Sequence, residues 1–222
     1  MKLNVSARAI AAAGLFVSNE KGRYYLHGVY VTPHPTGGVV VSATTGEKLC
    51  LIHDKDGSAD RPILLKMDFS DKRLKDGKSG EIRLAIDAPD VDRVMPETPA
   101  VIHTRCEGGE LGPRAGFITA SEIDGSYPWE GLKRMFRLDH IDAPLSGSRC
   151  INPARFVDCG KAAMLLGAIN GMLHLSRYPD DPSGPFLARP WGIGNALFLV
   201  MPGLGHNDKS TNDFAWAREA LK

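Results

Sequence analysis

Histidine and cysteine side chains, which are well suited to metal binding and nucleophilic chemistry, are scattered along the chain. The sequence contains seven histidines and four cysteines: His27, His34, His53, His103, His140, His174, His206, Cys50, Cys106, Cys150 and Cys159. None of them pairs with another at the ligand spacing of a zinc site, and no CxxC motif occurs. We therefore expect reduced, mostly buried thiols and no metal site.

Sequence motifs that position a catalytic group are also missing. The chain has no GxSxG nucleophile elbow, no Walker A loop and no dinucleotide-binding glycine fingerprint. The nearest approach to an acidic cluster is Asp87, Asp90 and Asp92, which fall in an expected loop, where exposure to solvent explains them. The sequence thus predicts a protein that is not an enzyme and has no cofactor.

The small net charge of +1 conceals an uneven distribution of charged residues. Residues 61–83 carry seven basic and four acidic residues, whereas residues 84–125 carry eight acidic residues and three arginines. A basic surface beside an acidic one is typical of a protein that binds a polyanion and stays soluble. An ordinary mixed surface gives the same pattern, so both interpretations stay open.

Short helices and strands must position these charged side chains. A first helix is predicted by apolar residues at helical spacing: Val5, Ala9, Ala12, Ala13 and Phe16. A second long helix is predicted by Asn152 as N-cap, Pro153 in the first turn and Gly167 just beyond the end. Between them, a short helix is expected over 69–75. Strands are predicted within residues 23–54 and over 62–67, 81–86, 100–105, 116–123, 171–178, 185–189 and 196–201.

This order repeats one helix followed by several strands. It indicates an α+β fold of repeated modules, each with one helix packed on an antiparallel sheet. We expect a complete domain of two modules over 1–128, a connector over 129–148, one module over 149–204 and a tail with a short helix over 205–222. No apolar run is as long as a membrane span and no leader is evident, so we expect a cytoplasmic protein without a membrane partner.

Four short motifs resemble those of the bacterial DNA polymerase III beta subunit, the sliding clamp. RYYLHG (23–28) is similar to the family's RYYLNG, and ATTGEKL (43–49) is similar to its ATDGHRL, both in the central clamp domain. IDGSYP (123–128) is similar to the IDGRFP that ends this domain, and LVMPGL (199–204) to the VVMPMRL that ends the last domain. The resemblance implies a DNA-clamp-like fold with one complete clamp domain and half of another.

In that family, helices line a ring around duplex DNA and contact phosphates without reading bases. The resemblance therefore implies duplex DNA as a sequence-independent partner. Basic residues on or near the expected helices are the candidates for this contact: Arg8, Lys21, Arg23, Lys72, Arg73, Lys75, Arg155 and Lys161. For each residue taken singly, a solvated surface charge is the simpler interpretation.

The resemblance also implies a pocket for short linear motifs of DNA polymerases and other clamp-binding proteins. Its residues carry over as Leu26, Thr44, Gly46, Glu47, Lys48, Leu49, Pro128, Val200, Met201 and Pro202. At the rim, Thr45, Glu47 and Lys48 replace the family's Asp, His and Arg, so the usual polymerase peptide is expected to bind weakly or not at all. The alternative is that Leu26, Leu49 and Met201 are simply core residues.

These expectations together describe a processivity or tethering factor in DNA replication. Clamp rings contain twelve modules, so a chain of three modules is expected to assemble as a homo-oligomer, and four chains would complete such a ring. A smaller ring, or no ring, is equally compatible with the sequence. The alternative function is a clamp-derived adaptor, inhibitor or transcription-related regulator that binds proteins without encircling DNA. The tail, with Phe214 and Trp216, is expected to be a terminal helix, with occupation of the pocket as the alternative.

Overall fold

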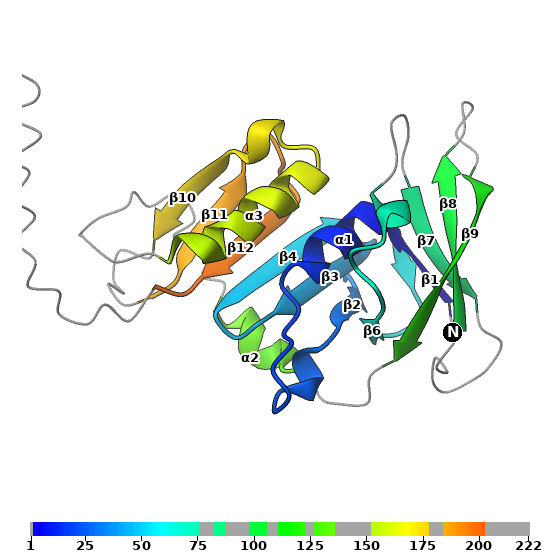
Figure 1. Ribbon diagram of the computed structural model, residues 1–222, viewed down its shortest axis with the longest axis horizontal. Coiled ribbons are helices and arrows are strands. Elements are labelled where there is room, and N and C mark those ends of the chain that lie inside the picture. Colours follow the sequence, from blue (N-terminus) through cyan, green and yellow to red (C-terminus); the bar gives the residue numbers. More distant parts are fainter. Residues whose placement is uncertain are drawn as a thin grey trace, which may run out of the picture.

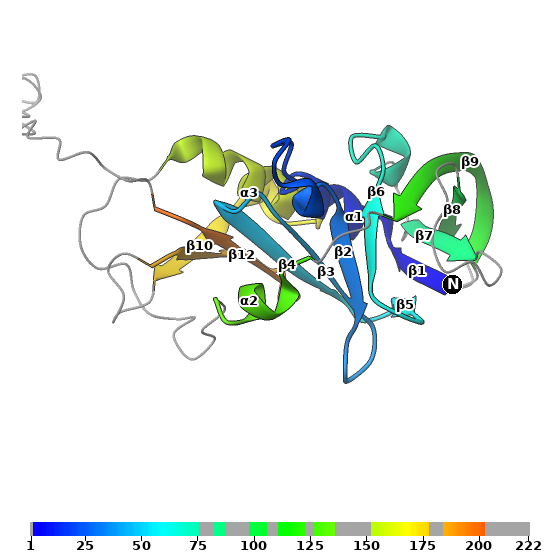
Figure 2. The ribbon, with the colours of Figure 1, turned by 90° about the horizontal axis from the view of Figure 1, so that it is seen from below.

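A computed structural model describes residues 2–75, 82–87, 98–105, 111–122, 127–135, 152–177 and 184–202. These residues form one continuous antiparallel sheet with two helices on one face and a short helix on the other (Figures 1 and 2). None of the helices in these ranges is long and apolar enough to cross a membrane.

Twelve strands are hydrogen-bonded in the order β10-β11-β12-β4-β3-β2-β6-β9-β8-β7-β1-β5. Along the chain they are β1 Lys2–Ser6, β2 Val29–Pro33, β3 Val39–Thr44, β4 Lys48–Asp54, β5 Ser58–Ala59, β6 Ile63–Lys66, β7 Ile82–Asp87, β8 Thr98–Arg105, β9 Leu111–Glu122, β10 Leu173–Arg177, β11 Phe186–Pro190 and β12 Ala196–Val200. Strand β9 pairs with β8 along most of its length and with β6 only through Ser121 and Glu122. It therefore joins two parts of the sheet, and it curves between them in Figure 2.

The helices are α1 Ala7–Gly14, α2 Trp129–Lys133 and α3 Pro153–Leu165. Single 3₁₀ turns are η1 Tyr24–Leu26, η2 Lys72–Leu74 and η4 Ile169–Gly171. Helices α1 and α3 lie side by side on one face of the sheet, and α2 lies on the opposite face (Figure 2). We call the face that carries α1 and α3 the helix face and the opposite one the outer face.

Helix α1 is built to lie close to its surroundings on every side. The Ser6 hydroxyl caps it by accepting a hydrogen bond from the Ala9 amide at 3.3 Å. Most of its residues are alanine, and all except Arg8 and Gly14 are buried. The sheet, α3 and the segment around η2 surround it, and a Cβ atom added at Gly14 would lie 2.2 Å from the Phe69 Cβ. Small side chains thus allow the sheet, α3 and the segment around η2 to pack closely against α1.

Helix α3 begins and ends where its sequence predicts. The Asn152 side chain accepts a hydrogen bond from the Ala154 amide at 3.0 Å, and Pro153 occupies the first turn, where its missing N–H costs nothing. At the other end, Gly167 adopts a φ of 100°, which stops the helix. The three strands that follow, β10 to β12, pair in sequence order and extend the sheet beyond β4.

Successive side chains of each strand point to opposite faces of the sheet, so their burial shows which residues face the helices. Residues such as Cys50 and Phe198 face the helices and belong to the large hydrophobic cluster around α1 and α3. Their neighbours Leu49 and Leu199 face the other way and form a second cluster with Leu132 of α2. The sheet is therefore a middle layer, apolar on both faces where β4 meets β12.

Three expected elements differ from the observed ones. Val5 lies in strand β1, because Leu3 and Val5 alternate with the less buried Asn4 and Ser6. Residues 24–26, expected as strand, form turn η1, and residues 69–75, expected as a short helix, contribute only η2. Most of the expected connector, from residue 136 to 148, and the whole tail 205–222 lie outside the described residues.

Candidate functional site

The two halves of the expected partner pocket meet where β4 pairs with β12. Lys48 lies opposite Val200 and Leu49 opposite Leu199, so motifs about 150 residues apart in the sequence are hydrogen-bonded neighbours. The ladder continues beyond the strands, because the Met201 amide donates to the Glu47 carbonyl at 2.8 Å. We call this region the β4–β12 junction.

The turn that precedes β4 is held by its own side chains. The Thr44 hydroxyl donates to the Lys48 carbonyl at 2.8 Å and accepts from the Gly46 amide at 2.9 Å. Gly46 has a φ of 89°, a conformation that favours glycine, and the Arg23 guanidinium lies against it and donates to the Thr45 carbonyl at 3.4 Å. This packing fixes the position of Glu47 at the tip.

Glu47 and Arg155 close the junction with an ion pair. The Arg155 guanidinium lies 2.6 Å from the Glu47 carboxylate and also donates to the Met201 carbonyl at 2.8 Å. Arg155 stands on α3, so the pair fastens the helix to both strand ends. The Glu47 side chain is largely exposed, and the residue that replaces the family's rim histidine therefore already has a cationic partner.

Lys48 faces the helices and not the outer face. Its ammonium group pairs with Asp158 of α3 and donates to the Leu15 carbonyl at the end of α1 at 2.8 Å. The same group lies 5.3 Å from the centre of the Phe16 ring. Alternation explains this placement, because Val200, its partner across the ladder, also faces the helices. Lys48 thus links α1 and α3 to the junction on the helix face of the sheet.

The apolar residues of the expected pocket lie under α2. Leu26 and Leu49 are only 4% and 2% exposed, and they pack in one cluster with Tyr127 and Leu132. Pro128, the N-cap residue of α2, is exposed beside them. A peptide side chain at the junction would therefore rest against α2 or displace it. Sequence reasoning missed this cover, since nothing in the sequence shows that Leu132 packs on Leu49.

The eight expected DNA-contacting residues fall into two groups. Lys21, Lys72 and Lys161 are exposed, and Lys161 stands on α3. The other five are half-buried or already ion-paired. Arg8 and Lys75 are half-buried, and Arg23, Arg73 and Arg155 pair with Glu20, Asp71 and Glu47, respectively. The structure does not gather all eight on one helix surface. The exposed side of α3 instead carries Val157 and Met164 on either side of Lys161.

The buried titratable groups are unsuited to nucleophilic chemistry. Burial raises the pKa of Cys159 to about 12 and raises the pKa of Cys50 and Tyr127 above their ordinary values. A thiol or phenol that stays protonated is inert at neutral pH. Within the described ranges, no group of three or more histidine, cysteine, aspartate or glutamate side chains is placed to hold a metal ion.

No protein-family model matches the sequence, and no curated protein matches it. Solved structures do match. The DNA polymerase III beta subunit of Borrelia burgdorferi superposes with a TM-score of 0.57 at 12% identity, over 92% of this chain. The sliding clamp of Bartonella birtlesii gives 0.54 at 14% identity over 91%, and the beta subunit of Thermotoga maritima gives 0.54 at 13% identity over 93%. The chain has the sliding-clamp fold.

The match confirms the α+β clamp-like fold that the four motifs predicted. It covers 65–66% of each of those clamps, so the chain spans slightly less than two thirds of their length. Identities of 12–14% establish the fold alone. What the clamp fold does in this chain must therefore be argued from the chain's own residues.

Proposed function

We propose that this protein is a clamp-type tethering factor in DNA replication, which surrounds or cradles duplex DNA without sequence specificity. One observation carries the proposal: nearly the whole described chain superposes on sliding clamps, with α1 and α3 side by side on one face of a continuous sheet. Lys161 and the exposed Lys21 and Lys72 are the residues proposed to meet phosphates. Assembly of several chains into a ring completes this proposal.

Retention on DNA of different topology tests it. A protein ring stays on a nicked circular plasmid and slides off after the plasmid is made linear, whereas simple electrostatic binding is the same on both.

The salt dependence of DNA binding gives a second test. If three lysines each contact one phosphate, the logarithm of the binding constant falls with the logarithm of salt concentration with a slope of about −3. Lys161→Ala is expected to reduce this slope by about 1. The matched control is Lys66→Ala, because Lys66 is exposed on β6, in the register of the outer face.

We further propose that the β4–β12 junction binds short linear motifs of DNA polymerases or other clamp-binding proteins. The half-buried Met201 and Pro202 beside the exposed Glu47 offer an apolar surface with a polar rim. Binding of a labelled clamp-binding peptide is expected to weaken in Met201→Ala and to be unchanged in Met164→Ala, which removes an exposed methionine of α3. Equal affinity for both variants would locate the peptide elsewhere.

A second candidate is an adaptor that uses the junction without encircling DNA. It is favoured by the composition of the helix face. The outward side of α1 is covered by Phe69 and Leu74, and the outward side of α3 presents Val157 and Met164. Native mass measurement separates the two candidates, because a monomer at micromolar concentration together with equal retention on circular and linear plasmid supports the adaptor.

A further inference from the structure

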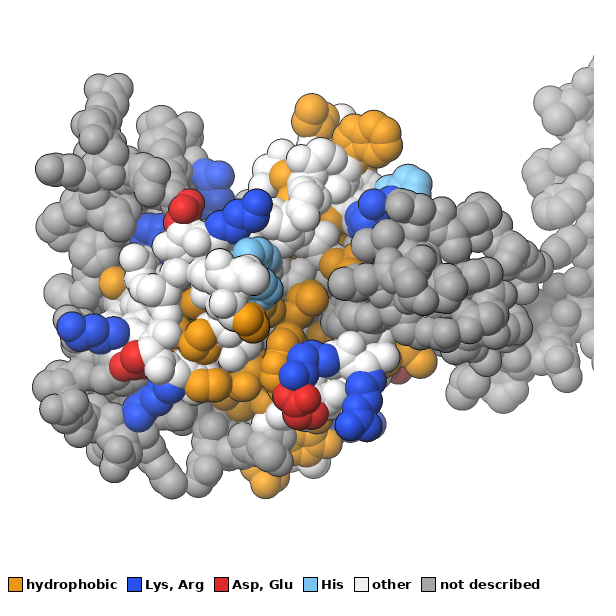
Figure 3. Space-filling model, turned by 180° about the vertical axis from the view of Figure 1, so that it is seen from behind, with side chains coloured by type: hydrophobic (Ala, Val, Ile, Leu, Met, Phe, Trp, Pro, Cys, Tyr) orange, Lys and Arg blue, Asp and Glu red, His pale blue; other side chains and the backbone are white. Residues whose placement is uncertain are grey.

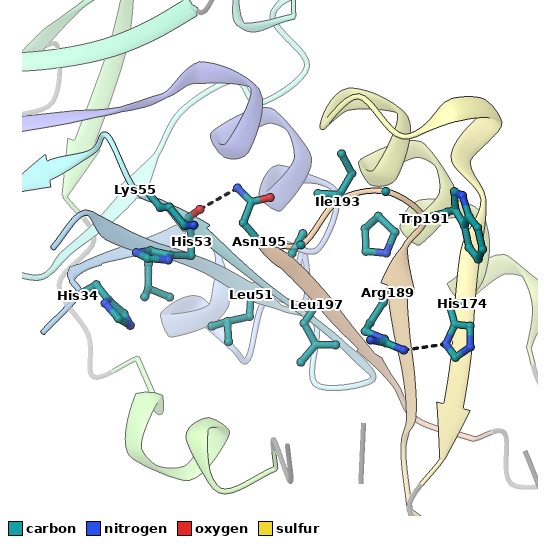
Figure 4. A pocket seen from close by; sticks show the side chains of 15 residues that line it. His34, Leu51, His53, Lys55, His174, Arg189, Trp191, Ile193, Asn195 and Leu197 are labelled. Carbon is teal, nitrogen blue, oxygen red and sulfur yellow. Dashed lines mark hydrogen bonds between the residues drawn. The ribbon is translucent and has the colours of Figure 1, made fainter. Parts of the chain in front are cut away.

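A hollow lies on the outer face, beyond the part of the sheet that α2 covers (Figures 3 and 4). Its volume is about 840 Å³, within the range of roughly 300–1,000 Å³ that is usual for ligand sites. It crosses the strands from β3 to β10, and it lies at the opposite ends of β4 and β12 from Glu47 and Met201. We call it the outer groove.

The floor of the outer groove is apolar. Leu51 of β4 and Leu197 of β12 lie directly opposite each other across the same pair of strands that forms the junction. Val40 of β3 adds to this surface. Figure 3 shows the outer face, where hydrophobic side chains gather between basic and histidine side chains. Apolar ligand groups would be removed from water here.

The polar groups of the outer groove are mainly donors and cations. Arg189 and Lys55 contribute two permanent positive charges, and no aspartate or glutamate is among the described residues that line the groove. Arg189 donates to Nδ1 of His174 at 3.2 Å, so a neutral His174 carries its proton on Nε2. The Thr36 amide donates to Nδ1 of His34 at 3.3 Å, which leaves Nε2 of that ring as a donor too. An anion that accepts hydrogen bonds would complement these groups.

Aromatic rings stand on two sides of this floor. The rings of His34 and His53 lie with their centres 4.3 Å apart and their planes tilted by 36°, and Trp191 stands on the other side with 59% of its surface exposed (Figure 4). The Asn195 side chain donates to the His53 carbonyl at 2.9 Å and so holds the turn that carries Trp191 against β4. The groove therefore has preformed walls as well as a floor.

We propose that the outer groove binds a short acidic peptide segment of a partner protein, with apolar side chains between its carboxylates. The carboxylates would meet Arg189, Lys55 and the histidine donors, and the apolar side chains would cover Leu51 and Leu197. A single strand of nucleic acid fits less well, because it carries a phosphate at every nucleotide and requires a continuous row of cations. Here two permanent cations flank a leucine floor.

Fluorescence anisotropy with a labelled hexapeptide of sequence Glu-Leu-Glu-Phe-Glu-Leu tests the proposal on the full chain. We expect saturable binding, and Arg189→Ala is expected to raise the dissociation constant about tenfold or more through loss of charge-assisted hydrogen bonds. Trp191→Ala should also weaken binding. The matched controls are Arg134→Ala and Tyr24→Ala, which remove exposed side chains of the same types outside the groove and should leave binding unchanged.

Several results would overturn the proposal. Among them are the absence of saturable binding, equal dissociation constants for Arg189→Ala and Arg134→Ala, and equal binding of the reversed-charge peptide Lys-Leu-Lys-Phe-Lys-Leu. Tighter binding of octathymidylate that weakens in Trp191→Ala would identify a nucleic-acid site instead and would also overturn it. Met201→Ala separates the two sites, because binding in the outer groove must be indifferent to a substitution at the β4–β12 junction.

Discussion

A buried ion pair between Arg83 and Asp54 ties three strands together, and its removal should be costly. Arg83 Nη1 lies 2.9 Å from Asp54 Oδ1, and Arg83 Nε donates to the Asn4 side chain at 2.9 Å. The other carboxylate oxygen of Asp54 accepts from the Ser6 amide at 2.7 Å. The side chains of Arg83 and Asp54 are only 2% and 8% exposed. The pair therefore connects β7, β4 and β1 away from water.

Arg83→Met keeps the length of the side chain and leaves the Asp54 carboxylate buried without its cation. Loss of one partner of a buried pair costs about 3–5 kcal/mol in the free energy of unfolding. With a urea m-value of about 1–3 kcal/mol per molar, the unfolding midpoint should fall by about 1 M or more. In Arg83→Met/Asp54→Asn no charge remains, and the amide oxygen can still accept from Ser6. We expect this double variant to lose less stability than the two single variants added together, by about 1–3 kcal/mol.

Urea unfolding followed by circular dichroism measures all three variants under the same conditions. The control is Arg73→Met, since Arg73 pairs with Asp71 at the surface and its loss should leave the midpoint unchanged. If Arg83→Met lowers the midpoint no more than this control does, the pair does not hold the strands together and the reasoning is wrong. Additive losses in the double variant would show that the two charges are not coupled.

Three further predictions concern closely packed positions. Gly14→Ala is expected to lower the free energy of unfolding by about 1–3 kcal/mol, because its new methyl group would overlap Phe69. Cys50 and Cys159 should not react with Ellman's reagent at pH 8 until the chain is unfolded, so at least two of the four thiols stay protected. Burial raises the pKa of the Tyr127 phenol, so this tyrosine ionises at a lower pH in the unfolded chain than in the folded one. The contribution of Tyr127 to stability is therefore present below pH about 10 and is lost as the pH rises further. Tyr127→Phe should reduce this alkaline loss of stability, measured by urea titrations at high pH.

Each of these predictions has a contrast within the chain. Gly131→Ala adds a methyl group with nothing within 4 Å, so it should not destabilise, and a loss as large as that of Gly14→Ala would exclude steric overlap as the cause. Tyr24→Phe changes an exposed ring and should leave the alkaline dependence unchanged. Rapid reaction of all four thiols in the folded protein would contradict the burial of Cys50 and Cys159.

Local signals predicted the elements well wherever the sequence marks both ends. The ends of α3 were predicted from Asn152, Pro153 and Gly167. The three strands after it begin and end within one or two residues of their expected bounds. The first helix was extended too far back to Val5, because alternation in a short strand and helical spacing share residues in so brief a window. Apolar Tyr24 and Leu26 indicated a strand by composition, but the chain turns there.

Long-range pairing was predicted only where a motif implied it. The motifs around Glu47 and Met201 indicated that β4 and β12 approach each other, and the ladder between them has this arrangement. Two features were not predicted: Lys48 points toward the helices, and Leu132 packs over Leu49. Both depend on strand register and on packing between segments that are distant in the sequence. The outer groove was missed for the same reason. Its histidines are far apart in the sequence, and only the sheet brings them together.

The alanine-rich helix α1 also has a consequence for the evolution of this fold. Six of its eight residues are buried against neighbours on several sides, so almost any larger or charged substitution there would be removed by selection for folding. On α3, by contrast, Val157, Lys161 and Met164 are exposed and can change without disturbing the core. New charge on the helix face can therefore be added on α3 with less cost to folding than on α1.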